Sequence, residues 1–88
     1  MKIKQGFVKR KVKDKYLVVA VGTLSDTYKK FIELNETASF IWDKVQEGLE
    51  VANIAKELSL KYNIDFDKAL NDTKKFIDIL IKEEIVCE

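Results

Sequence analysis

Few side chains in this 88-residue sequence are suited to catalysis. The chain has no histidine, the residue that most often serves as a general base and as a metal ligand. Its one cysteine, Cys87, cannot form a disulfide within the chain or a cysteine-based zinc site. The glycines Gly6, Gly22 and Gly48 do not form a phosphate-binding motif. The sequence therefore predicts a protein that is not an enzyme and that uses no cofactor or metal.

The remaining candidates for chemistry have simpler structural interpretations. Asp65 and Asp67 flank the expected start of a helix, where carboxylates cap the backbone and complement the helix dipole. Trp42 falls on the apolar face of another expected helix, which favours a core position over a ligand platform. We therefore expect binding, not catalysis, to be the activity of this chain.

The first third of the chain has the pattern of a small sheet. Two runs rich in β-branched and aromatic residues, Phe7–Val12 and Tyr16–Val21, flank the polar turn Lys13–Lys15 and predict an antiparallel hairpin. After a turn-like stretch at Gly22–Thr27, residues Tyr28–Leu34 predict a third strand. Such a small sheet needs a packing partner on one face.

From Asn35 onward, the apolar residues recur at helical spacing. Asn35 is a good N-cap for a first helix, which Gly48 ends. A second helix is predicted over residues 51–61 and a third over residues 66–84, and Ile79 falls outside the apolar stripe of the third. The prediction is one α+β domain over residues 1–88, winged helix-turn-helix-like, with a three-stranded antiparallel N-terminal sheet followed by three helices.

The charge is distributed unevenly along the chain. Residues 1–15 contain seven basic residues and one acidic residue, a net charge of +6, whereas residues 16–88 have a net charge of −5. A basic arm attracts nucleic acid, an anionic membrane or an acidic peptide. The alternative, which charge alone favours, is an exposed hairpin that keeps the protein soluble and discourages edge pairing.

A winged-helix nucleic-acid-binding protein is the main alternative function. In that class, the helix that enters the groove supplies basic or amide side chains to phosphates and bases. The predicted third helix, with its cap, contains four lysines, six acidic residues and no arginine, so its net charge is −2. Because DNA is densely anionic, this helix disfavours a nucleic-acid partner.

Peptide binding is the better match to the predicted sheet. If the third strand lies at an edge, an extended peptide can add to it as a fourth strand. Alternation places Ile32 and Leu34 on one face of this strand, and Phe31 and Glu33 on the other. The alternative is that both apolar sets pack under helices while lysines blunt the edge.

One stretch resembles a known family. The run Leu-Asn-Glu-Thr-Ala at residues 34–38, followed by Ile41-Trp42, by Gly48 and by the Ile-Ala-x-x-Leu pattern at residues 54–58, is typical of the PqqD-like family, named after coenzyme PQQ synthesis protein D. The hairpin and the third helix match this family in pattern only. The Asn-Glu-Thr part has a sufficient explanation as a helix cap.

The resemblance implies a peptide-recognition role. PqqD-like proteins bind the leader of a ribosomally made precursor peptide by β-strand addition and present it to a modifying enzyme, often a radical SAM maturase. The leader lies between the third strand and the third helix. Carried to this sequence, the resemblance implies a peptide-binding site formed by Tyr28, Lys30, Phe31, Ile32, Glu33, Leu34, Lys74, Ile77, Asp78 and Ile81.

These observations lead to one functional expectation. We expect a cytoplasmic leader-peptide-binding protein, since no signal peptide or membrane-spanning run is visible in the sequence. Its expected partners are a precursor peptide and a modifying enzyme such as a radical SAM maturase. We expect no membrane or nucleic-acid partner, and a monomer or a weak homodimer.

Overall fold

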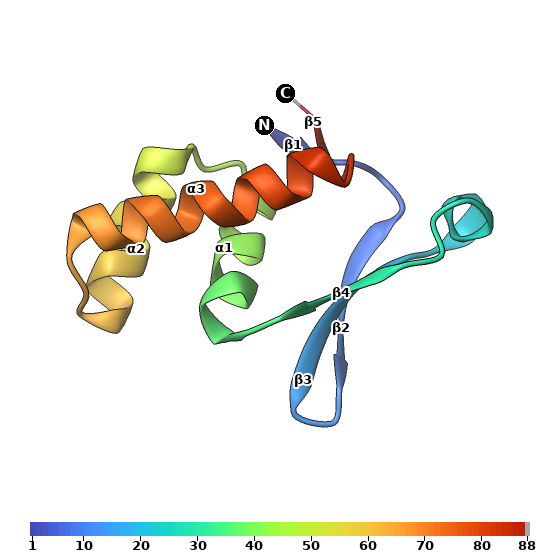
Figure 1. Ribbon diagram of the computed structural model, residues 1–88, viewed down its shortest axis with the longest axis horizontal. Coiled ribbons are helices and arrows are strands. Elements are labelled where there is room, and N and C mark those ends of the chain that lie inside the picture. Colours follow the sequence, from blue (N-terminus) through green and yellow to red (C-terminus); the bar gives the residue numbers. More distant parts are fainter. Residues whose placement is uncertain (88) are drawn as a thin grey trace.

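The computed structural model describes residues 1–87, with strands in the first part of the chain and helices in the second (Figure 1). The elements are β1 (Lys2–Ile3), β2 (Phe7–Val12), β3 (Lys15–Ala20), a short 3₁₀ helix (Gly22–Asp26), β4 (Phe31–Leu34), α1 (Glu36–Gln46), α2 (Val51–Tyr62), α3 (Phe66–Lys82) and β5 (Val86–Cys87). The predicted α+β fold, an antiparallel sheet followed by three helices, is confirmed.

The main sheet has the strand order β2-β3-β4 and is antiparallel throughout. Val18 in the central strand pairs with Lys9 on one side and with Ile32 on the other. The third strand begins at Phe31, three residues later than the predicted start at Tyr28. The reason is local, because the Thr27 amide donates to the Leu24 carbonyl at 3.2 Å and closes the preceding 3₁₀ turn, and the Tyr28 amide donates to the same carbonyl at 2.9 Å.

The two chain ends form a small ladder that the sequence pattern did not predict. Lys2 pairs with Cys87 and Ile3 with Val86, which brings both ends together above α3 (Figure 1). Strands of two residues are too short to show a period of two. Helix α3 ends at Lys82, two residues before the predicted end, because Glu84 has a left-handed φ of 60° and directs the chain into β5.

The core lies between one face of the main sheet and the three helices. Val18, Leu34 and Phe7 reach it from the sheet. Trp42 is fully buried, so its predicted core position is confirmed. The predicted cap of α1 is also confirmed, since the Ala38 amide donates to Asn35 Oδ1 at 2.8 Å. Within residues 1–87, no helix combines the length and the apolar composition required to cross a bilayer.

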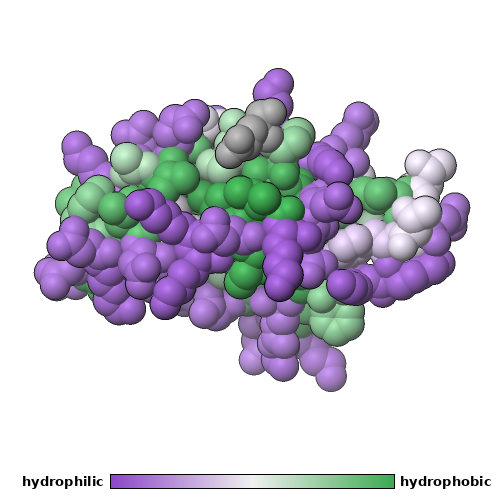
Figure 2. All heavy atoms as spheres, turned by 45° about the horizontal axis from the view of Figure 1, so that its top comes forward, coloured by the Kyte–Doolittle hydropathy of each residue, from purple (hydrophilic) through white to green (hydrophobic). Residues whose placement is uncertain are grey.

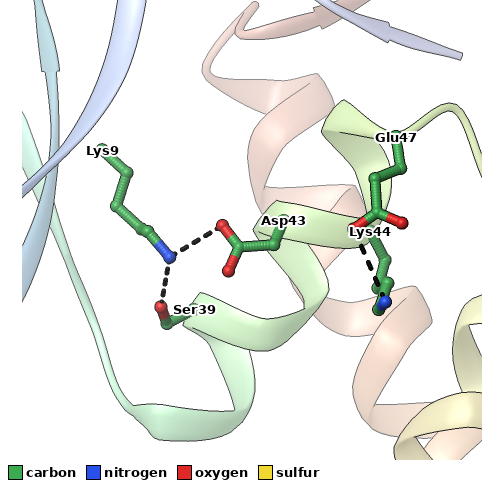
Figure 3. Close-up of polar contacts among 5 residues, drawn as sticks. All are labelled: Lys9, Ser39, Asp43, Lys44 and Glu47. Atoms are coloured by element: carbon green, nitrogen blue, oxygen red, sulfur yellow. Dashed lines mark hydrogen bonds and ion pairs between the residues drawn. The ribbon is translucent and has the colours of Figure 1, made fainter.

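Lys9 links the basic hairpin to α1, as Figure 3 shows. Its Nζ lies 2.7 Å from both Ser39 Oγ and Asp43 Oδ1, and 4.7 Å from the centre of the Tyr16 ring. Only 18% of the Lys9 side chain is exposed, so the protein covers most of it, and its ammonium makes two charge-assisted contacts. One member of the basic arm therefore has a structural role in the packing of the sheet on the helices.

Candidate functional site

Strand β4 lies at an edge of the main sheet, and in the described structure its ladder partner is β3 alone. Leu34 is 4% exposed and Ile32 is half-buried on the face toward the helices, whereas Phe31 and Glu33 are exposed on the opposite face. The predicted alternation along this strand is therefore confirmed. The outer edge of β4 presents backbone N–H and C=O groups that another extended segment can pair with.

A groove lies beside this edge, between β4 and α3. It consists of two open pockets of about 420 and 460 Å³ that share Asn35, Ala38, Phe76 and Ile79. We call this feature the β4–α3 groove. The first pocket also contains Ile32 and Glu33, and the second continues between α1 and the first half of α3 with the lining residues Thr37, Ile41, Tyr62, Ile64, Lys68, Asp72 and Lys75.

The surface of the groove combines apolar and charged side chains. The apolar part comes from Ile32, Ala38, Phe76 and Ile79, so it spans the strand, the start of α1 and the middle of α3. At the far end, Lys68 Nζ pairs with Asp72 Oδ2 at 3.2 Å, one helical turn along. The apolar part of the groove beside β4 can therefore bury an apolar side chain of a ligand, away from this ion pair.

The helix wall of the groove is a different face of α3 from the predicted one. Ile77 is 4% exposed and belongs to the core, and Lys74, Asp78 and Ile81 are exposed but line neither pocket of the groove. Helical residues advance by about 100° each, so Ile79 and Ile81 point about 200° apart. The signal in the sequence was Ile79, an apolar residue outside the core stripe.

Apolar side chains of α3 thus reach the surface on more than one side. Ile79 is 50% exposed and Ile81 is 43% exposed. In Figure 2, apolar side chains gather near the middle of the face formed by α3 and the paired chain ends, and polar side chains surround them. Exposure alone therefore does not identify the groove-facing side of α3, whereas the pocket beside β4 does.

Contacts at the start of β4 join it to the end of α3. The Tyr28 hydroxyl donates to Glu83 Oε1 at 3.2 Å, and Lys30 Nζ lies 3.4 Å from the same oxygen. The Tyr28 ring also packs edge-on against Phe7, with centroids 4.9 Å apart. Burial raises the pKa of the Tyr28 hydroxyl, and the Glu83 carboxylate raises it further. These two predicted site residues therefore hold the strand and the helix together at one end.

The arrangement is suited to binding an extended peptide. A free strand edge supplies backbone hydrogen bonds, and the adjoining groove supplies an apolar surface for alternate side chains. Across the described residues, no group of three or more Cys, Asp and Glu side chains is placed to hold a metal ion.

Comparisons with known proteins agree with this geometry. Residues 16–86 match the family described as coenzyme PQQ synthesis protein D (PqqD). A structure of TbiB1 in complex with the TbiA(beta) leader peptide has a TM-score of 0.77 and 22% identity, and the alignment covers 97% of this chain and 93% of that one. A lasso peptide synthetase B1 complexed with its leader peptide has a TM-score of 0.80 and 16% identity, over 99% and 96% of the two chains. No curated protein matches significantly. The chain belongs to the PqqD family.

Proposed function

We propose that this protein binds the leader segment of a ribosomally made precursor peptide as a fourth strand at the edge of β4. The observation that carries this proposal is the free edge of β4 beside the apolar β4–α3 groove. Support comes from the two similar structures, both of which contain leader peptides.

Backbone pairing and side-chain burial have separate roles in this binding mode. The ladder with β4 provides hydrogen bonds that depend little on the leader sequence, because every residue except proline offers the same groups. The groove selects among leaders, since it accepts apolar side chains next to Ile32, Phe76 and Ile79. For a short added strand, we expect dissociation constants of about 0.1–10 μM, or roughly −7 to −10 kcal/mol.

The bound leader is then presented to a modifying enzyme, with a radical SAM maturase as the expected partner class. In this role, the protein supplies affinity and placement, and the enzyme supplies the chemistry. Holding a substrate near a catalyst raises its effective concentration without any catalytic residue in the scaffold.

Titration with precursor peptides tests the proposal. The probes are fluorescently labelled synthetic peptides that cover the N-terminal part of the precursor encoded nearest to this gene, with scrambled peptides as controls. We expect saturable binding in the low micromolar range or tighter, and new protection of the β4 amides from hydrogen exchange. A folded protein that binds none of these peptides at high micromolar concentration contradicts the proposal. Gel-shift assays with DNA at low and moderate salt test the nucleic-acid alternative.

A further inference from the structure

We infer that this protein recognises its leader on both faces of the added strand, with an apolar leader side chain beside Phe31 and a basic one beside Glu33. Both side chains belong to the sheet face that points away from the helices. Phe31 lies outside the β4–α3 groove, and Glu33 lies at its border. The inference rests on the proposed function and adds the side-chain pattern of the leader to it.

Two rows of side chains cross the outer face of the sheet and end at the free edge. In the first row, Val8 pairs with Val19 and Val19 with Phe31. In the second row, Arg10 pairs with Leu17 and Leu17 with Glu33. Neighbouring positions of this kind share one face of a sheet, with Cβ atoms about 4.5–5.5 Å apart. A strand added at β4 contributes the next side chain to each row.

Phe31 is the large apolar side chain that the fold leaves at this edge. It is 63% exposed, whereas Leu34 in the same strand is 4% exposed. An exposed aromatic residue on an edge strand favours unwanted strand pairing, so a polar residue at this position is safer for the free protein. An apolar leader residue in the same row covers the ring and makes the type of aromatic–aliphatic pair that stabilises sheets.

Glu33 offers a carboxylate at the same edge, two residues further along β4. Its present partner is Lys15 on β3, with Nζ and Oε1 3.3 Å apart and both side chains more than half exposed. An exposed ion pair of this kind is weak, and a carboxylate has four lone-pair sites. A lysine or arginine of the leader can therefore bind the free side of Glu33, opposite Lys15.

Ile32 lies between these two positions and faces the groove. The leader residue beside Ile32 therefore points inward and is apolar. The leader residues beside Glu33, Ile32 and Phe31 therefore form a tripeptide. It reads basic–apolar–apolar from N to C if the leader runs antiparallel to β4, and apolar–apolar–basic if it runs parallel. The substrate class is thus a leader with adjacent apolar residues next to one positive charge.

Three variants of the protein test this inference with the peptide that binds in the titration described above. Phe31→Ser removes the aromatic ring, and Glu33→Lys reverses the charge. Val12→Ser is the matched control, because Val12 is 49% exposed on the same sheet face but lies in β2, at the opposite edge of the sheet from β4. We expect Phe31→Ser to weaken binding about two- to fivefold, as the loss of one cross-strand pair predicts. Val12→Ser should leave the affinity unchanged.

The charge contact is tested by exchange. We expect Glu33→Lys to weaken binding of the unmodified leader about threefold or more. A leader in which glutamate replaces the basic residue should restore the affinity for the Glu33→Lys variant, but not for the unchanged protein. Circular dichroism confirms that each variant is folded.

The outcomes separate the two levels of the proposal. If the unchanged protein binds no precursor peptide, the proposed function fails, and this inference fails with it. If it binds, and both edge variants bind as tightly as Val12→Ser, the inference alone is overturned. Unchanged leader affinity together with slower modification by the partner enzyme also overturns it, because the outer rows then contact the enzyme and not the leader.

Discussion

The Tyr28 hydroxyl donates a hydrogen bond to Glu83 Oε1 across 3.2 Å, which joins the segment before β4 to the residue that caps α3. Lys30 approaches the same carboxylate at 3.4 Å. The two walls of the β4–α3 groove are therefore tied together at one end, where the strand begins and the helix stops. This tie helps to set the separation between strand and helix that an inserted peptide meets.

Replacement of Tyr28 by phenylalanine should destabilise the protein by about 1 kcal/mol near neutral pH, because one hydrogen bond to a carboxylate is lost. The pKa of Tyr28 in the folded protein is raised above its usual value of 10.0. The contribution of its protonated hydroxyl to the free energy of unfolding is therefore fully present below pH 10, and it is lost as the pH rises through the folded-state pKa. Urea unfolding of both proteins at neutral and alkaline pH measures this. The difference between them should shrink at high pH, and a constant difference contradicts the assignment.

Ile79→Ser should weaken leader binding, because Ile79 lines the apolar part of the groove. Truncation of this side chain removes about 1–2 kcal/mol of buried apolar contact, which corresponds to a five- to thirtyfold higher dissociation constant. The matched control is Ile81→Ser, since both isoleucines are about half exposed on α3 but point about 200° apart. Fluorescence anisotropy with the same leader peptide measures both. Equal effects of the two changes would place the peptide elsewhere on α3.

The sequence predicted the features that depend on local pattern. The hairpin, the Asn35 cap and the three helices follow from alternation, capping chemistry and helical spacing, and all are present. The alternation in β4 also predicted which residues face the core, as Leu34 and Phe31 show.

The features that the sequence did not predict depend on contacts between distant segments. The pairing of Ile3 with Val86 joins residues at opposite ends of the chain, and neither two-residue strand shows a period. The groove-facing side of α3 depends on the angle at which the helix crosses the sheet, which spacing within the helix does not specify. The predicted wall therefore included Ile77, a core residue, and omitted Phe76 and Ile79.

Lys9→Met should cost about 1–2 kcal/mol of stability, because it leaves Asp43 and the buried Ser39 without their shared donor while keeping most of the aliphatic stem. Lys11→Met is the control, since Lys11 is exposed on the same strand and lies 5.8 Å from the Tyr16 ring centre. Urea denaturation should place the control within about 0.5 kcal/mol of the unchanged protein. Similar losses of stability for Lys9→Met and Lys11→Met would contradict the structural role of Lys9. If that role holds, variants that test residues 1–15 as a docking surface should keep Lys9 unchanged.

A proline scan of the leader should reveal the geometry of strand addition. In an antiparallel ladder, alternate residues direct their N–H groups toward the neighbouring strand, and proline has no N–H to donate. Proline at those positions should weaken binding tenfold or more, whereas proline at the intervening positions removes no bond to β4 and should have a smaller effect. The measurement is a titration of single-proline leaders, with proline outside the paired segment as the control. An effect that repeats every second residue supports addition at β4, and a scan without that period would mean that the leader binds through its side chains alone.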